Sequence, residues 1–135
     1  MSRGGLERRA LQGIVAVLAL VPLSAGLQGV IEGPAATLGD PAAGPRPVDL
    51  DSHYRYLSGL LLGLGLVFLS CIPGIERKGT RFRLAAAVVL VGGLGRALSL
   101  ALHGAPTWPH LVGLTLELAV VPALAVWQAR VARSG

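Results

Sequence analysis

Long apolar stretches dominate the hydrophobic pattern of the chain, and short polar segments separate them. A membrane-spanning helix needs roughly 20 mostly apolar residues. Four stretches meet that requirement: Ala10–Ile31, Tyr54–Ile72, Phe82–Leu102 and His110–Val131. A soluble amphipathic helix would carry a charged face through such a stretch, and these stretches do not. The pattern predicts an all-α membrane protein in which a single domain of 135 residues forms four transmembrane helices.

The segment Gly33–Ser52 is expected to form an outer loop, because it is rich in Pro and Gly. Asp51 or Ser52 is placed to cap the second helix, since a side-chain oxygen there accepts a hydrogen bond from a first-turn N–H group. The carboxylates of Asp49 and Asp51 also suit the positive end of the helix dipole. The second span is therefore expected to begin near Tyr54.

Basic residues predict the orientation of the helices. Nine of the twelve Lys and Arg residues lie on one side if the chain crosses the membrane four times: Arg3, Arg8, Arg9, Arg77, Lys78, Arg81, Arg83, Arg130 and Arg133. Because Lys and Arg are enriched in cytoplasmic segments, we expect both termini in the cytoplasm. The four helices then form an antiparallel bundle in the inner membrane of the cell.

The first apolar stretch is also compatible with a cleaved signal peptide that ends near Ser24–Gly26. The stretch continues to Ile31, however, and is longer than the signal core of about 7–15 residues. We therefore favour a membrane anchor. Cleavage would leave the orientation of the other three spans unchanged.

Composition agrees with a lipid environment, since 53% of residues are hydrophobic and 14% are charged. The net charge of +5 does not indicate a nucleic-acid partner, because the basic clusters flank the membrane, where anionic lipid accounts for them. The single cysteine, Cys71, excludes an internal disulfide and a thiolate metal cluster. Gly59 and Gly63 are four residues apart, a spacing that favours close helix contact within or between chains.

Two charges lie well inside the spans at matching depth. Arg96 is six residues before Leu102, about 9 Å along a helix, and Glu117 is seven residues after His110, about 10 Å. An unpaired charge at the bilayer centre is costly, whereas an Arg–carboxylate pair forms strong hydrogen bonds. The sequence predicts an ion pair between Arg96 and Glu117.

Further polar residues share one helix face in the outer half of each span. With Arg96 and Glu117 they are Gln28, Glu32, Arg55, Ser99 and His103. We expect this set to line a polar pocket that opens to the outside, with the loop Gly33–Ser52 over its mouth. The alternative, that these groups only specify helix packing, stays open.

Three segments of the chain resemble the bacterial membrane proteins grouped as domain of unknown function 4345: DSHYRYLSGLLLGLGLVF (51–68), GLGRALSLALHGAPTW (93–108) and LTLELAVVPALAVW (114–127). The matching positions are Asp51, Arg55, Arg96, Ser99, Gly104, Pro106 and Glu117. The resemblance covers most of the chain and implies a small four-span membrane protein. It supplies no activity, because the family is named for lacking one.

The predicted pocket suggests a binding function. A small polar or anionic ligand, or a lipid headgroup, would lie against Arg55 and Arg96, because a planar guanidinium suits carboxylate and phosphate. Four spans are few for a transporter, so a second copy or another membrane protein is the expected partner beside the lipid bilayer.

Two alternatives remain open. One is a redox or metal-dependent membrane enzyme, or a quinone- or haem-binding subunit, with His53, His103 and His110 on the outer side. The chain contains no recognisable catalytic or metal-binding motif, and we predict no cofactor and no metal. The other is a structural or interaction subunit of a membrane complex, whose polar pairs fix its packing.

Overall fold

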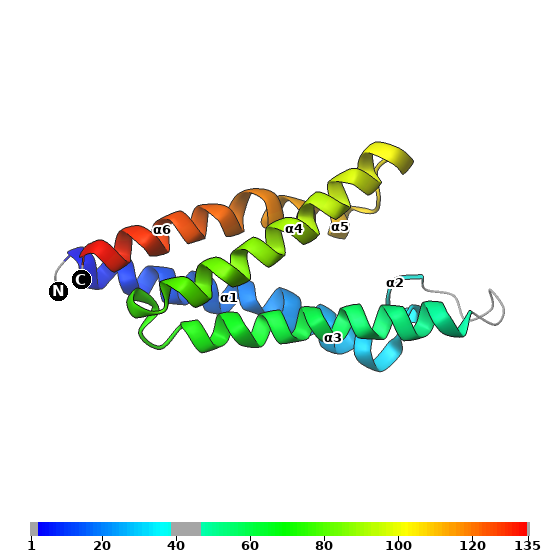
Figure 1. Ribbon diagram of the computed structural model, residues 1–135, viewed down its shortest axis with the longest axis horizontal. Coiled ribbons are helices and arrows are strands. Elements are labelled where there is room, and N and C mark those ends of the chain that lie inside the picture. The colour runs from blue at the N-terminus through cyan, green and yellow to red at the C-terminus, as the bar shows by residue number, and fades with distance from the viewer. Residues whose placement is uncertain (1–2, 39–46, 135) are drawn as a thin grey trace. The chain divides into compact units, whose positions relative to one another are not determined.

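The computed structural model describes residues 3–38 and 47–134, and the elements in these ranges are all helical (Figure 1). They are α1 (Arg3–Glu32), α2 (Ala35–Leu38), α3 (Val48–Cys71), the 3₁₀ turn η2 (Ile75–Arg77), α4 (Gly79–His103), α5 (Trp108–Thr115), the π-helical turn η3 (Leu116–Val120) and α6 (Val121–Ser134). Four helices among the described residues are long and apolar enough to cross a membrane: α1, α3, α4 and the stretch Trp108–Ser134. The predicted all-α fold with four such helices is confirmed.

Helix α3 begins earlier than the sequence suggested. Its first residue is Val48, and the N–H of Asp51 donates to the carbonyl oxygen of Pro47 at 3.2 Å. Proline favours the start of a helix because its fixed φ already matches helical geometry. Asp51 and Ser52 therefore lie inside α3, which corrects their prediction as helix caps.

The predicted outer loop is only partly described. Helix α2 lies within it, and the start of α3 at Val48 shortens it from the other side. Residues 39–46, with Asp40 and Arg46, lie outside the described residues.

The chain forms two compact units: Met1–Gly13 with Cys71–Gly135, and Ile14–Ser70. In the first unit, α4 packs against α6, α5 and η3, and η2 packs against α6. In the second unit, α1 and α3 approach so closely that a Cβ on Gly26 would stand 2.8 Å from Leu62 Cα.

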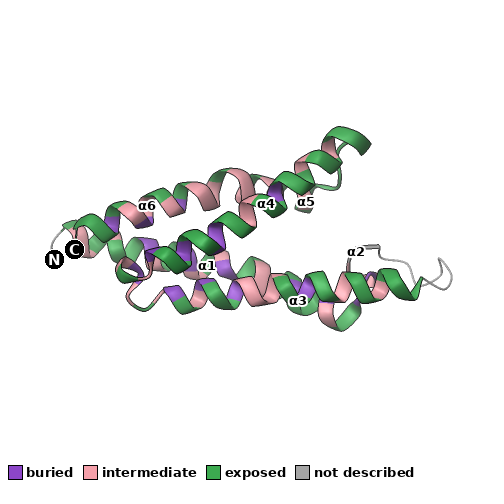
Figure 2. Ribbon diagram, viewed as in Figure 1, coloured by how far each residue is buried: buried purple, intermediate pink, exposed green. Residues whose placement is uncertain are grey.

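Exposed residues occur along all the long helices (Figure 2), and many of them are large and apolar. Val17 is 65% exposed, Leu66 55% and Leu94 57%, whereas the fully buried side chains are few. Soluble monomers rarely expose large continuous apolar patches, but lipid tails solvate such a surface. Together with the four long apolar helices, this surface identifies a multi-pass membrane protein in contact with the bilayer.

Candidate functional site

The turn between α4 and α5 positions the first of two arginine clusters. Gly104 follows α4 with φ of +89°, a conformation that L side chains rarely adopt, and its N–H donates to Leu100 O at 3.0 Å. Pro109 stands in the first turn of α5, where a missing N–H does no harm. The N–H of His110 donates to Thr107 O at 3.0 Å, which fixes His110 at the start of α5.

Arg96 of α4 meets two side chains from the returning helix. Its Nε lies 3.1 Å from Glu117 Oε2, and its Nη1 lies 3.0 Å from His110 Nδ1. A guanidinium only donates hydrogen bonds, so Nδ1 must be the acceptor and His110 is a neutral imidazole with its proton on Nε2. We call Arg96, His110 and Glu117 the Arg96 cluster.

Burial within the Arg96 cluster is uneven. The Glu117 side chain is 18% exposed, whereas the Arg96 side chain is 41% exposed. Oε2 of Glu117 is buried, and its contact with Arg96 Nε lacks the alignment of a hydrogen bond. The carboxylate is thus paired by charge and incompletely satisfied by hydrogen bonds.

A π-helical turn carries Glu117. In η3, the N–H of Val121 donates to Leu116 O, one residue further back than in an α-helix. Pro122 follows and has no N–H of its own, so the helical ladder is already interrupted here. Such turns widen a helix locally and occur frequently at functional sites.

Close contact with α4 also fixes Glu117. A Cβ on Gly93 would stand 2.9 Å from Glu117 Cβ and 2.7 Å from Leu118 Cδ2. Only glycine lets the two backbones approach to this distance. The register between α4 and η3 therefore places Glu117 level with Arg96.

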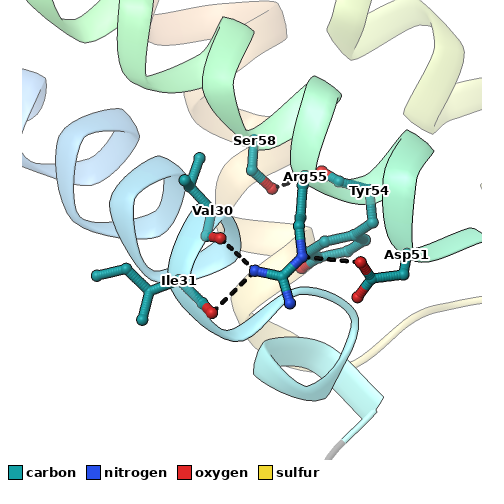
Figure 3. Close-up of polar contacts among 6 residues, drawn as sticks. All are labelled: Val30, Ile31, Asp51, Tyr54, Arg55 and Ser58. Atoms are coloured by element: carbon teal, nitrogen blue, oxygen red, sulfur yellow. Dashed lines mark hydrogen bonds and ion pairs between the residues drawn. The ribbon is translucent and has the colours of Figure 1, made fainter.

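The second cluster surrounds Arg55 of α3 (Figure 3). Its Nε donates to Asp51 Oδ2 at 2.8 Å, one helical turn earlier, and its Nη1 donates to the carbonyl oxygens of Val30 and Ile31, the latter at 2.9 Å. These carbonyls belong to the last turn of α1, which lacks intrahelical partners. Arg55 therefore caps the end of α1 from the neighbouring helix.

A glycine turn completes this contact. Gly33 follows α1 with φ of +63°, and a Cβ there would stand 2.9 Å from Arg55 Nη2. Asp51 binds the guanidinium from the other side. The Arg55 side chain is 40% exposed and the Asp51 side chain 41%. We call Asp51, Arg55 and Gly33 the α1–α3 clasp, and its geometry joins two helices.

The other predicted site residues lie apart from these contacts. Gln28 Nε2 donates to Glu32 Oε2 at 3.2 Å within α1, and both side chains are exposed. Ser99 and His103 are exposed on α4, one and two turns beyond Arg96.

Two features of these clusters were not predicted from the sequence. The ion pair of Asp51 with Arg55 could have been predicted, because the two residues are four apart within one helix. The contact of His110 with Arg96 had no such signal, because it depends on the turn between α4 and α5.

Among the described residues, no group of three or more His, Cys, Asp or Glu side chains is arranged to hold a metal ion. Cys71 is buried at the end of α3, as its apolar surroundings suggested.

Comparison with known proteins identifies a family. A family model described as a domain of unknown function (DUF4345) matches residues 10–128, which confirms the resemblance seen in the sequence. The match includes the α1–α3 clasp and the whole Arg96 cluster. No curated protein and no solved structure matches the chain.

Proposed function

The chain belongs to the family described as a domain of unknown function (DUF4345), and this family supplies no activity. From the residues themselves, we propose that the protein binds a small anion at Arg96. The ligand class is a carboxylate or a phosphate-like oxyanion, whether dissolved or part of a lipid headgroup.

The proposal includes a placement in the membrane. The four helices run antiparallel through the inner membrane as one domain, with both termini in the cytoplasm. Lys78, in the short link before α4, and Arg81 and Arg83, near the start of α4, support this placement, because Lys and Arg are enriched at cytoplasmic helix ends. The Arg96 cluster then lies in the outer half of the protein and faces the outside.

The observation that carries the proposal is the unused capacity of Arg96. A guanidinium has five N–H donors, and the contacts with Glu117 and His110 engage Nε and Nη1. In the described part of the chain, Nη2 makes no hydrogen bond, and the Arg96 side chain is 41% exposed. Donors of this kind, held in a planar fork, match the oxygens of a carboxylate or phosphate.

Neighbouring residues extend the site. Ser99 and His103 lie on the same face of α4 as Arg96, one and two turns toward the outside, and both are exposed. They supply a hydroxyl and an imidazole along the approach to Arg96. Arg55 is assigned a different role, because its Nη1 donates to the backbone carbonyls of Val30 and Ile31 and so joins α3 to the end of α1.

Thermal unfolding in mild detergent tests this function. A ligand that binds only the folded state raises its stability by RT ln(1 + [L]/Kd), so sodium acetate or sodium sulfate should raise the melting temperature above that in sodium chloride of equal ionic strength. Arg96→Lys keeps the charge and loses the fork, and should lose most of the shift. Arg130→Gln, which removes a positive charge at the far end of α6, is the control and should keep it.

Three results would contradict anion binding at Arg96. They are the absence of a shift with either anion, a full shift in Arg96→Lys, and an equal loss in Arg130→Gln. Native mass spectrometry of the purified protein adds an independent measurement, because a retained acid or anionic lipid should be seen in the wild type and lost in Arg96→Lys.

A second candidate is a structural or interaction subunit of a membrane complex. The contact of Gly93 with Glu117 supports it, because the Arg96–Glu117 pair lies at a tightly packed helix interface and polar pairs can serve helix packing alone. This candidate predicts that the double variant Arg96→Leu, Glu117→Met assembles with its partner as the wild type does. The anion-binding function predicts that the same variant loses the acetate and sulfate shifts.

A further inference from the structure

The Arg96 cluster is balanced in charge before any ligand binds. Arg96 carries one positive charge, Glu117 one negative charge at 3.1 Å, and His110 is neutral because its Nδ1 accepts from Arg96. An added anion would leave this part of the membrane protein with a net negative charge. Uncompensated charge inside a membrane span is costly, so a cation has to accompany the anion.

The cluster itself provides the place for that cation. We propose that the Arg96 site takes up its anion together with one proton, which Glu117 carries. This inference rests on the proposed anion-binding function and adds a fixed stoichiometry to it. The balance is simple: the anion pairs with the guanidinium of Arg96, and a proton from water converts the Glu117 carboxylate to a neutral carboxylic acid.

The geometry of Glu117 favours this role. Its Oε2 is buried, and the contact with Arg96 Nε lacks the alignment of a hydrogen bond. A proton on the Glu117 carboxylate removes the charge attraction between Glu117 and Arg96 Nε. Nε and Nη2 of Arg96 can then both donate hydrogen bonds to the anion. The protonated carboxyl also gains an O–H donor of its own. Protonation of Glu117 therefore also frees the Arg96 guanidinium from its ion pair.

His110 is the less suitable carrier. It already accepts a hydrogen bond from Arg96 Nη1 at 3.0 Å, so a proton on Nδ1 would place two cationic groups in contact. It would also leave the Glu117 carboxylate in place as a competitor of the anion. His110 instead holds the guanidinium in position.

The remaining charged groups on the packed helices are remote from Glu117. On α6 they are Arg130 and Arg133, about 20 Å or more along the helix from Glu117. On α4, Arg81 and Arg83 are similarly far from Arg96. His103, at the end of α4, is exposed and about 10 Å along the helix from Arg96. Charge in the site is therefore set by Arg96, Glu117 and His110.

The chemical consequence is a site for a weak acid that binds as its anion plus a proton. The filled site has the same net charge as the empty one, so filling it does not leave an uncompensated charge in the bilayer. Anion affinity should rise about tenfold for each unit of falling pH while Glu117 is ionised in the empty site, because one proton is linked to each anion.

Proton counting on the full chain in detergent tests the inference. Sodium acetate is added to the protein in weakly buffered solution at pH 6 to 7.5, with a pH indicator, and binding is followed in parallel by calorimetry. We expect one proton taken up per acetate bound in the wild type. Glu117→Gln, which resembles the protonated acid, should bind acetate without proton uptake and with an affinity independent of pH. His53→Gln, at an exposed position of the other unit, is the control for a histidine outside the site and should retain the uptake.

The outcomes separate the two proposals. Acetate binding to the wild type without proton uptake, or with an affinity independent of pH, overturns the inference and leaves the anion-binding function standing. Proton uptake that persists in Glu117→Gln overturns the assignment to Glu117. No binding of acetate or sulfate at any pH overturns the anion-binding function, and the inference with it. The number of protons taken up per acetate by the wild type is enough to test the inference, so the test does not depend on whether Glu117→Gln folds.

Discussion

Gly93 of α4 lies directly against Glu117 of η3, and a Cβ on Gly93 would stand 2.9 Å from Glu117 Cβ. Neither backbone can yield easily, because each belongs to a long helix. The contact fixes the distance between α4 and the π-helical turn. It thereby sets how far the Glu117 carboxylate lies from the Arg96 guanidinium, which is 3.1 Å between Nε and Oε2.

Gly93→Ala should therefore weaken both the fold and the Arg96 cluster. Overpacking a close contact costs about 1–3 kcal/mol, and we expect a lower melting temperature in detergent. Gly92→Ala is the matched control, since a Cβ there meets no described residue within 4 Å and alanine in a helix is favoured over glycine by roughly 0.5–1 kcal/mol. Equal melting temperatures for the two variants would contradict the packing argument.

The contact of α1 with α3 leads to a similar prediction in the other unit. A Cβ on Gly26 would stand 2.8 Å from both Leu62 Cα and Ser58 O. Gly26→Ala should destabilise this pair of helices by about 1–3 kcal/mol, because backbone atoms cannot turn aside as a side chain can. Gly63→Ala places its methyl group where no described residue lies within 4 Å, and it should melt at or slightly above the wild-type temperature because alanine is favoured over glycine in a helix. The prediction fails if the two variants have the same stability.

These glycines show what the sequence could not predict. The spacing of Gly59 and Gly63 favoured close helix contact. Among the described residues, however, a Cβ on Gly63 would have nothing within 4 Å, and one on Gly59 would meet only Val30 Cγ2 at 3.9 Å. The close contacts between α1 and α3 are at Gly26 and Gly29 of α1 and at Gly65 of α3. Spacing identifies a face of small residues, whereas the rotation of each helix about its axis depends on tertiary packing.

The features that length and composition determine were predictable. Uninterrupted apolar stretches identified the four helices that can cross a membrane. A helix that crosses the hydrocarbon core needs roughly 20 residues, and it satisfies the hydrogen bonds of its own backbone in lipid. The family was recognisable from the segments around Arg55, Arg96 and Glu117. Counting residues also gave Arg96 and Glu117 a similar depth, since both counts begin at the same turn.

Local geometry limited the rest of the site. Pro47 starts α3 early and turns Asp51 from an expected cap into the partner of Arg55. The π-helical turn around Glu117 has no simple sequence signal apart from the proline that follows it. His110 reaches Arg96 only because Gly104 reverses the chain. Each of these features depends on backbone conformation at a helix end or within a turn.

Replacing Arg55 should loosen the end of α1. Arg55→Lys keeps the positive charge, but an ammonium cannot bind Asp51 and two carbonyls in the same planar arrangement. We expect faster amide hydrogen exchange in the segment that includes Gly33 and Ala36, whose N–H groups donate to Gly29 O and Gly33 O. Arg9→Lys, at an exposed position in the other unit, is the control. Unchanged exchange at Gly33 and Ala36 would show that Arg55 does not hold the end of α1.

The membrane orientation can be measured with reporter fusions. If both termini are cytoplasmic, alkaline phosphatase fused after Arg133 should be inactive, and green fluorescent protein at the same place should fluoresce. Phosphatase fused after Gly104, in the turn between α4 and α5, should be active. The opposite pattern at the two positions would reverse the orientation and place the Arg96 cluster on the cytoplasmic side.

Exchanging Arg96 and Glu117 tests whether their contact is an ion pair. Either single reversal, Arg96→Glu or Glu117→Arg, places two like charges together inside the membrane span. An unpaired charge at that depth costs about 2.5–3.5 kcal/mol on insertion scales, and we expect both single variants to be poorly folded. The double variant restores opposite charges at the same two positions and should recover much of the melting temperature and yield.

Full recovery is not expected from this exchange. His110 accepts a hydrogen bond from Arg96 Nη1, and a carboxylate at position 96 offers no donor in its place. The double variant should also lose the acetate and sulfate shifts, since the fork has moved onto η3. If the double variant is no more stable than either single reversal, the 3.1 Å contact is not an energetic pair, and Arg96 must be held in the protein by other groups.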